Sequence, residues 1–119
     1  MGNLSAHFSK AEFVCKCGCG SFIEQPALYA MLEEVRHAIG DVPISILSGT
    51  RCQAHNHACG GAKHSQHLLG KAADITVNGM TPYQVWQKVG KLAAVHGRGR
   101  YARFTHVDVR PGGRVDWTG

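Results

Sequence analysis

The sequence has 119 residues, of which 44% are hydrophobic and 18% charged, so its composition is that of one globular domain and not of a disordered chain. Its apolar runs fall well short of the roughly 20 residues that a membrane-spanning helix needs, and its start lacks the apolar stretch of a secretory signal. We therefore expect a single, monomeric domain over residues 1–119, synthesised in the cytoplasm without a signal peptide or membrane anchor.

The net charge of +5 comes from thirteen Lys and Arg residues against eight Asp and Glu residues. Five arginines concentrate the charge near the C-terminus: Arg98, Arg100, Arg103, Arg110 and Arg114. Such a surface favours polyanions, either nucleic acid or the anionic cell wall, although a solvated basic face is the plainer explanation. Because the spacing of a helix-turn-helix or a zinc finger is absent, we expect no nucleic-acid partner.

The first half of the chain predicts two helices and a strand. Ser9 and Glu12 form the pattern of a capping box at the start of a short helical turn. Residues 26–39 predict a longer helix, because Pro26 suits a first turn, apolar residues recur at helical spacing, and Gly40 is a natural stop. Residues 43–47 are rich in isoleucine and predict a strand.

The second half begins with a long polar segment, residues 48–66, of the kind that is functional or contains a helical turn. The later predicted elements are a strand at 71–77, a helix at 81–95, one or two strands within 100–109, and a last strand at 114–117. We expect the last strand to pair across the Pro111-Gly112-Gly113 turn, and Trp86 and Trp117 to lie in the core. The fold class is therefore α+β, with two main helices against a small, mainly antiparallel sheet.

Two histidines and an aspartate predict a metal site. His67 ends the polar segment, Gly70 permits a sharp turn, and Asp74 lies on the strand that follows, while His106 lies on a later strand. Two imidazoles and a carboxylate form a three-ligand zinc site with a position left open for water. Zinc there lowers the pKa of the water to roughly 7 and polarises a scissile carbonyl, so we expect Zn²⁺ as the cofactor.

Two further residues fit such a site. Asp108 shares a strand face with His106, and it either orients that ligand or takes the proton of the attacking water. Arg51 can clamp a substrate carboxylate with its planar guanidinium, and a structural salt bridge is its plainer role.

Three motifs carry a resemblance to a known family. They are SxHxxGxAxD from Ser65 to Asp74, the preceding SGxR that ends at Arg51, and a later strand similar to FxHVDVR around His106. Together they resemble the zinc D-alanyl-D-alanine carboxypeptidase family, which includes phage endolysins that cut the L-alanyl-D-glutamate bond. The resemblance covers nearly the whole chain and implies zinc on His67, Asp74 and His106, with substrate bound by Arg51 and Ser65.

One position departs from the family pattern. Several members carry a catalytic Glu, Asp or His three residues before the last zinc ligand, where this chain has Arg103. Arginine cannot accept a proton. Asp108 is then the expected catalytic base, with His64 and His57 as alternatives.

The resemblance implies zinc-dependent hydrolysis of peptide bonds in peptidoglycan stem peptides or cross-links, by a D,D-carboxypeptidase or by an endopeptidase of the endolysin type. The substrate then lies at the cell wall, in the periplasm or outside the cell, and the absence of a signal peptide fits a phage or prophage enzyme. The alternative is a non-catalytic wall-binding module that retains the zinc fold, which Arg103 favours.

The five cysteines have no assigned role in this scheme. They are Cys15, Cys17, Cys19, Cys52 and Cys59, and an odd number leaves at least one thiol outside any internal set of disulfides. Their plainest role is to fill space in the core as small apolar side chains. A disulfide from Cys52 to Cys59, or within residues 15–19, is an alternative in an oxidising compartment. A second metal on the CxCxC run lacks both the CxxC spacing of zinc ribbons and a fourth ligand.

Overall fold

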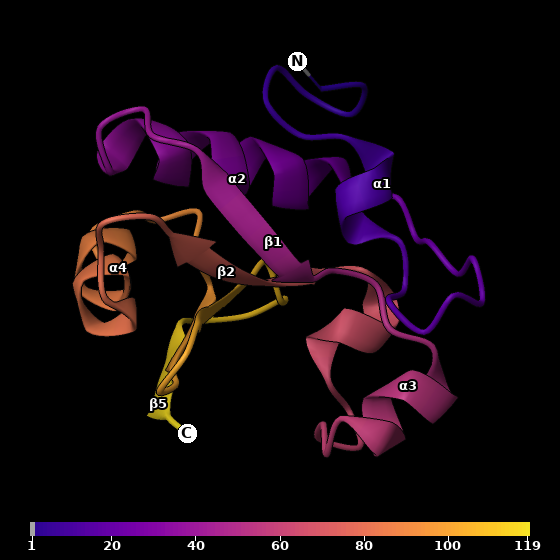
Figure 1. Cartoon of the computed structure of the whole chain (residues 1–119). Coiled ribbons are helices and arrows are strands. Elements are labelled where there is room, and N and C mark those ends of the chain that lie inside the picture. The colour runs from indigo at the N-terminus through magenta and orange to yellow at the C-terminus, as the bar shows by residue number, and fades with distance from the viewer. Residues whose placement is uncertain (1) are drawn as a thin grey trace.

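The computed structural model describes residues 2–119 and shows helices and strands mixed along the chain (Figure 1). The helices are α1 (Lys10–Phe13), α2 (Pro26–Ala38), α3 (Gln53–Ala58), the 3-10 turn η1 (Gln66–Leu69) and α4 (Pro82–Val89). The strands are β1 (Ile44–Ser48), β2 (Ala72–Val77), β3 (Gly97–Arg100), β4 (Thr105–Asp108) and β5 (Val115–Thr118). Within residues 2–119, no helix has both the length and the apolar character needed to cross a membrane.

The five strands form one sheet in the order β1-β2-β4-β3-β5. All neighbours are antiparallel except β3 and β5, which are parallel, so the predicted α+β class with a mainly antiparallel sheet is confirmed. The predicted pairing of the last strand across the 111–113 turn is wrong. Both edges of β4 are already hydrogen-bonded, to β2 and β3, so β5 pairs with the free edge of β3.

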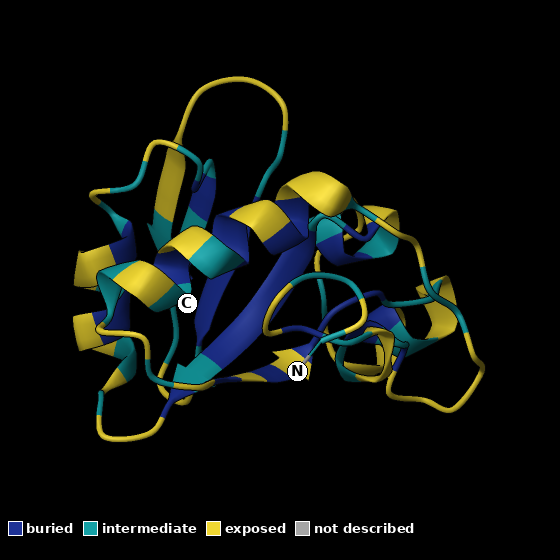
Figure 2. Cartoon of the chain, turned by 90° about the horizontal axis from the view of Figure 1, so that it is seen from above, coloured by how far each residue is buried: buried dark blue, intermediate teal, exposed yellow. Residues whose placement is uncertain are grey.

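The core lies between one face of the sheet and the helices α2 and α4. Because side chains alternate along a strand, Ile46, Ile75 and Val107 point to this face. Leu32 and Val35 of α2 are completely buried against them. Figure 2 shows the central strands and the inner side of α2 buried, with exposed residues on the outer turns of the helix. Burial of this apolar surface is the main favourable contribution to folding.

Helix α4 is shorter than the predicted 81–95. It ends at Val89 with Gly90 as its C-terminal cap, and the following residues form turns. The guanidinium of Arg114 donates hydrogen bonds to the backbone carbonyls of Gly90, Leu92 and Val95, which satisfies groups that a longer helix would have paired internally. Arg114 therefore supports the fold, and its exposed guanidinium also adds to the positive charge of the surface.

The opposite face of the sheet carries a polar row. Asp74 of β2 pairs in register with His106 of β4, His106 with Gly99 of β3, and Gly99 with Trp117 of β5. Residues directly opposite one another on neighbouring strands lie about 5 Å apart and share a face. The register of the sheet therefore places an aspartate, a histidine and an indole side by side, away from the apolar core.

Candidate metal centre

The turn before β2 places His67 over the polar face of the sheet. His67 lies in η1, which Gly70 ends with a left-handed φ of 70°. Gly70 also lacks the space for a side chain, because a Cβ there would lie 2.6 Å from the carbonyl oxygen of Ile23. The chain thus reverses sharply into β2, and Asp74 follows on that strand.

Three side chains converge at one point on this face. Nε2 of His67 and Nδ1 of His106 each lie 3.1 Å from Oδ1 of Asp74. All three residues are buried, with exposures of 2%, 7% and 4% for His67, His106 and Asp74. One ligand atom from each lies within 4.8 Å of the other two, which makes this a geometric metal-binding group. The structure therefore brings together the three metal ligands expected from the sequence.

Hydrogen bonds on the far side of each imidazole fix which nitrogen faces Asp74. Nδ1 of His67 lies 2.8 Å from the carbonyl oxygen of Gly49, which only accepts, so Nδ1 carries a proton and donates it. Nε2 of His106 lies 2.8 Å from Oδ2 of Asp108 and donates to it. Histidines that bind metals in proteins are held in this way, with the second nitrogen bonded to a carbonyl or a carboxylate.

The protonation states of His67 and Asp74 suit a cation bound between their facing atoms. Burial lowers the pKa of His67, so its imidazole is neutral and Nε2 presents a lone pair. Burial raises the pKa of Asp74, but interactions led by the hydrogen bond from His106 outweigh it and hold the pKa well below its usual range. A lone pair facing an ionised oxygen at 3.1 Å is repulsive unless a cation lies between them. Tetrahedral zinc with bonds of about 2.1 Å separates its ligand atoms by about 3.4 Å, close to this spacing.

Two carboxylates favour the protonated form of His106. Burial lowers its pKa, but hydrogen bonds to the carboxylates of Asp108 and Asp74 raise it more, so the net shift is upward. A metal at Nδ1 must displace this proton, which couples metal binding to proton release. The donor set of two imidazoles and one carboxylate suits zinc.

Arg51 lies directly beside this group. Its Nη2 donates to Oδ2 of Asp74 at 2.8 Å, its Nε to Oγ of Ser48 at 3.0 Å and its Nη1 to Oδ1 of Asn56 at 3.2 Å. A guanidinium has five N–H groups, so two remain for another acceptor. Arg51 thus forms a structural salt bridge with Asp74, which was one of its two expected roles. It also borders the cavity in front of the metal group.

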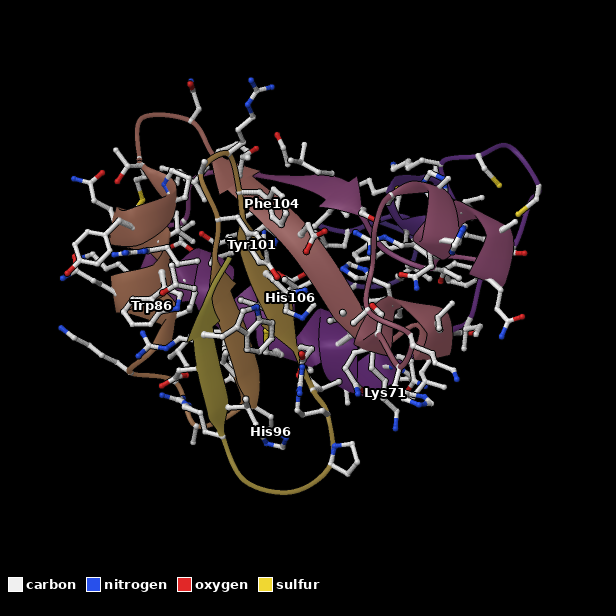
Figure 3. All side chains as sticks on the ribbon, turned by 90° about the horizontal axis from the view of Figure 1, so that it is seen from below. Lys71, Trp86, His96, Tyr101, Phe104 and His106 are labelled. Carbon is white, nitrogen blue, oxygen red and sulfur yellow. The ribbon has the colours of Figure 1, made fainter. Side chains whose placement is uncertain are left out.

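A cavity of about 370 Å³ opens onto the three candidate ligands. His64 and Ser65 line it from the loop before η1, and Tyr101, Phe104 and Trp117 line it from the β3–β4 connection and β5. The rings of Tyr101 and Phe104 are stacked, with centroids 4.6 Å apart. In Figure 3, which looks at the face away from α2, Tyr101, Phe104 and His106 gather near the middle of the sheet. The cavity is large enough for a short peptide segment.

A model of the peptidase M15 family matches residues 6–108, a range that includes the candidate metal ligands, Arg51 and Asp108. The chain belongs to the peptidase M15 family. A zinc D-Ala-D-Ala carboxypeptidase from Streptomyces albus G is 46% identical to this M15 chain over 44 residues. The matched segment is 37% of the chain and 17% of that relative, so the chain spans less than a fifth of the relative's length.

The other expected site residues of this M15 chain lie in different surroundings. Asp108 has no exposed surface, and besides His106 it binds Arg110, whose Nη2 donates to Oδ2 at 2.7 Å. Burial raises the pKa of Asp108, but the hydrogen bonds from His106 and Arg110 hold it well below the usual range. Ser65 caps η1 by accepting a hydrogen bond from the N–H of His67 at 3.2 Å, and it also borders the cavity.

His64 and His57, the two alternative bases, lie at different hollows of the surface. His64 borders the cavity in front of the metal group, whereas His57 borders a different hollow beside α3. Of the residues considered for the base, His64 is therefore the one that lines this cavity. Because Asp108 is enclosed by His106 and Arg110, its hydrogen bonds favour the orienting role over the catalytic one.

The M15 site has an aromatic wall that was not predicted from the sequence. Trp117 lies at the cavity instead of in the core, with its ring centroid 5.0 Å from that of His106 and its Nε1 donating to the hydroxyl of Tyr101 at 2.8 Å. The sequence pattern that could have predicted this wall is the alternation of glycine and arginine in β3. Gly97 and Gly99 face the site and make room for Asp108 and Trp117, while Arg98 lies 3.5 Å over the ring of Trp86 on the helical face.

Proposed function

We propose that this chain is a zinc-dependent peptidase that hydrolyses peptide bonds in the stem peptides or cross-links of peptidoglycan. The observation that carries the proposal is the convergence of His67, Asp74 and His106 beneath an open cavity, in a chain of the peptidase M15 family. The name of the Streptomyces relative, a zinc D-Ala-D-Ala carboxypeptidase, supports both the metal and the class of substrate.

In this proposal zinc is held by Nε2 of His67, Nδ1 of His106 and the carboxylate of Asp74. Three protein ligands leave a position free, as catalytic zinc sites require. When bound, zinc supplies a nucleophilic hydroxide at neutral pH and polarises the carbonyl that is attacked. The carbonyl of Gly49 and the carboxylate of Asp108 keep the two imidazoles turned toward the metal.

Arg51 is proposed to bind a carboxylate of the substrate. Its two remaining N–H groups can form a bidentate pair with a carboxylate that enters the cavity. Its bonds to Ser48, Asn56 and Asp74 hold the guanidinium rigid, so little side-chain entropy is lost when substrate binds. Stem peptides carry free carboxylates, so this contact suits both a carboxypeptidase and an endopeptidase. Ser65 lies near enough to the same cavity to contact the peptide backbone.

His64 is proposed as the residue that takes the proton from the attacking water. Histidine is the side chain that most often acts as a general acid or base in enzymes. His64 is exposed at the cavity, and its loop lies next to Ser65 and η1, so the imidazole can reach a group bound in front of the metal. Asp108, in contrast, is expected to act by orienting His106.

The test is hydrolysis of purified peptidoglycan by the zinc-loaded protein, with a chelated sample and a His67→Ala variant as controls. Fragments released only by the zinc-loaded wild type, identified by mass spectrometry, would support the proposal and name the bond that is cut. Absence of new fragment ends from a sample that contains zinc at this site would refute it.

A second function is favoured by one observation. Arg103 lies on the exposed turn between β3 and β4, at a position where several family members carry a catalytic side chain. A non-catalytic module that binds the cell wall through the same cavity would tolerate this arginine. Sedimentation with peptidoglycan that depends on zinc but releases no fragment would favour the module over the peptidase.

A further inference from the structure

Four of the five cysteines gather outside the cavity described above. Sγ of Cys15 lies 3.4 Å from that of Cys17 and 3.8 Å from that of Cys52, and Sγ of Cys17 lies 3.7 Å from that of Cys52. Cys19 completes a group in which the four sulfur atoms all lie within 4.8 Å of one another. The fourth ligand that the CxCxC run lacks in the sequence is thus supplied by a residue 33 positions after Cys19.

We propose that Cys15, Cys17, Cys19 and Cys52 form a second, structural zinc site. Tetrahedral zinc with Zn–S bonds of about 2.3 Å places its sulfur atoms about 3.8 Å apart, which is close to the separations found here. A disulfide needs sulfur atoms about 2.05 Å apart, so these distances do not fit a bonded pair. A closed set of four thiolates is the donor set of structural zinc and leaves no position for a substrate.

The loop that carries three of the cysteines is folded back on itself. The N–H of Cys15 donates to the carbonyl of Ser21 at 2.9 Å, which closes the loop at its base. Gly18 and Gly20 adopt left-handed φ angles of 87° and 81°, which residues with side chains rarely adopt. These two turns let three cysteines, each separated by one residue, direct their sulfur atoms to a common point.

Backbone amides also point at the sulfur atoms. The N–H of Cys52 donates to Sγ of Cys15, that of His55 to Sγ of Cys52, and that of Ser21 to Sγ of Cys19, each at 3.4 Å. Hydrogen bonds of this kind stabilise the ionised form of the acceptor, and the thiolate is the form of cysteine that binds metal. Cys59 lies outside the group, with its Sγ 3.5 Å from Nε2 of His55.

The site would fasten two distant parts of the chain. Cys52 is the N-cap of α3 and directly follows Arg51, while the other three ligands belong to the loop after α1. Figure 1 shows this loop running from α1 toward the part of the molecule that contains α3. Two hydrogen bonds already join the same segments, from Thr50 N–H to the carbonyl of Phe13 at 2.9 Å and from Ile23 N–H to the side-chain Oγ1 of Thr50 at 3.1 Å. Zinc here would hold the backbone next to Arg51.

The experiment measures metal content and needs no hydrolytic activity, so it is independent of the proposed peptidase. Protein purified under reducing conditions in the presence of zinc is analysed for zinc per chain. We expect two zinc ions in the wild type, one in Cys17→Ser and in Cys19→Ser, and two in the control Cys59→Ser. Cys17 and Cys19 are exposed, so these substitutions place no new group in the core.

A second measurement covers the case in which a variant does not fold. The wild type loaded with cobalt should show intense sulfur-to-cobalt charge-transfer absorption, which the site on His67, Asp74 and His106 cannot produce because it has no sulfur ligand. Zinc should also protect four of the five thiols from a thiol reagent. One zinc per chain without sulfur-to-cobalt absorption, or iron in place of zinc at the cysteines, would overturn the proposal.

Discussion

Nε2 of His106 donates a 2.8 Å hydrogen bond to Oδ2 of Asp108, a carboxylate with no exposed surface. The same oxygen accepts from Arg110 at 2.7 Å, so the carboxylate is held from two sides. This relationship turns Nδ1 of His106 toward Asp74. Asp108 can either orient His106 or take the proton of a water molecule. The first role affects zinc affinity, and the second affects the turnover rate.

Asp108→Asn should weaken zinc binding without abolishing hydrolysis. Loss of a partner that orients a metal ligand usually reduces metal affinity by about 10- to 100-fold. Zinc titration should show this loss, while the turnover rate at saturating zinc stays within about tenfold of the wild type. Loss of turnover by about 100-fold or more at full zinc occupancy would instead identify Asp108 as the general base.

His64→Ala should reduce the turnover rate by about 100- to 10,000-fold, the usual contribution of a general base, with zinc content unchanged. His57→Ala is the matched control, because this histidine borders a different hollow. The two variants are compared by the release of peptide fragments from peptidoglycan at saturating zinc. Equal activity of His64→Ala and His57→Ala would exclude His64 from the chemistry.

Arg51→Lys should lower kcat/KM by about 10- to 100-fold on a substrate with a free carboxylate. Lysine keeps the charge but loses the planar pair of N–H donors, and hydrogen bonds to charged groups contribute about 1.5–3 kcal/mol. An amidated version of the same peptide should be cut equally well by both proteins. Because Arg51 also binds Asp74, zinc content is measured in parallel. An equal loss on both peptides would indicate a structural role alone.

Gly97→Ala should weaken zinc binding by disturbing Asp108. A Cβ at Gly97 would overlap both carboxylate oxygens of Asp108, so this carboxylate would have to shift. Overpacking of this kind costs typically 1–3 kcal/mol of stability. Gly113→Ala is the matched control, since a Cβ there meets nothing within 4 Å and its φ is not left-handed. Thermal unfolding and zinc titration of both variants test the expectation, which fails if they behave alike.

Glu33→Gln should destabilise the protein in a pH-dependent way. The carboxylate of Glu33 accepts hydrogen bonds from Ser5 Oγ at 2.6 Å and from the N–H of His7 at 2.8 Å, which joins the N-terminal segment to α2. Burial raises the pKa of Glu33, but the hydrogen bonds from Ser5 and His7 outweigh it, so the net shift is downward. A lowered pKa contributes stability above the ordinary value near 4.3, and this contribution is lost as the pH falls through the folded pKa.

The measurement for Glu33 is the free energy of unfolding at pH 7 and at pH 3. We expect Glu33→Gln to lose about 1 kcal/mol at pH 7 and less at pH 3, because the contribution of the wild-type carboxylate falls as the pH approaches its lowered pKa. Glu34→Gln is the control, because Glu34 is the exposed neighbour on the same helix. A loss that is the same at both pH values would show that the charge of Glu33 does not contribute.

Local sequence determined the elements that hold the site. The turn at Gly70 and the following strand place His67 and Asp74 seven residues apart on one side of the sheet, and strand alternation places His106 and Asp108 on a common face. The capping box of α1 is confirmed by the bond from the N–H of Ser9 to Glu12 at 2.7 Å. These features depend on backbone geometry over a few residues, and that is why motif spacing was enough to predict them.

Contacts between distant segments were decided only by the tertiary structure. Three such contacts join residues at least 18 positions apart: the carbonyl of Gly49 with His67, β5 with β3, and Cys52 with the 15–19 loop. The sequence does not reveal which backbone carbonyl accepts a hydrogen bond from His67, because every residue has such a group. It also does not reveal which free sheet edge a strand of four residues pairs with. Such contacts follow from the packing of the whole chain. The residue pattern alone predicted the candidate ligands His67, Asp74 and His106, and the fold decided what surrounds them.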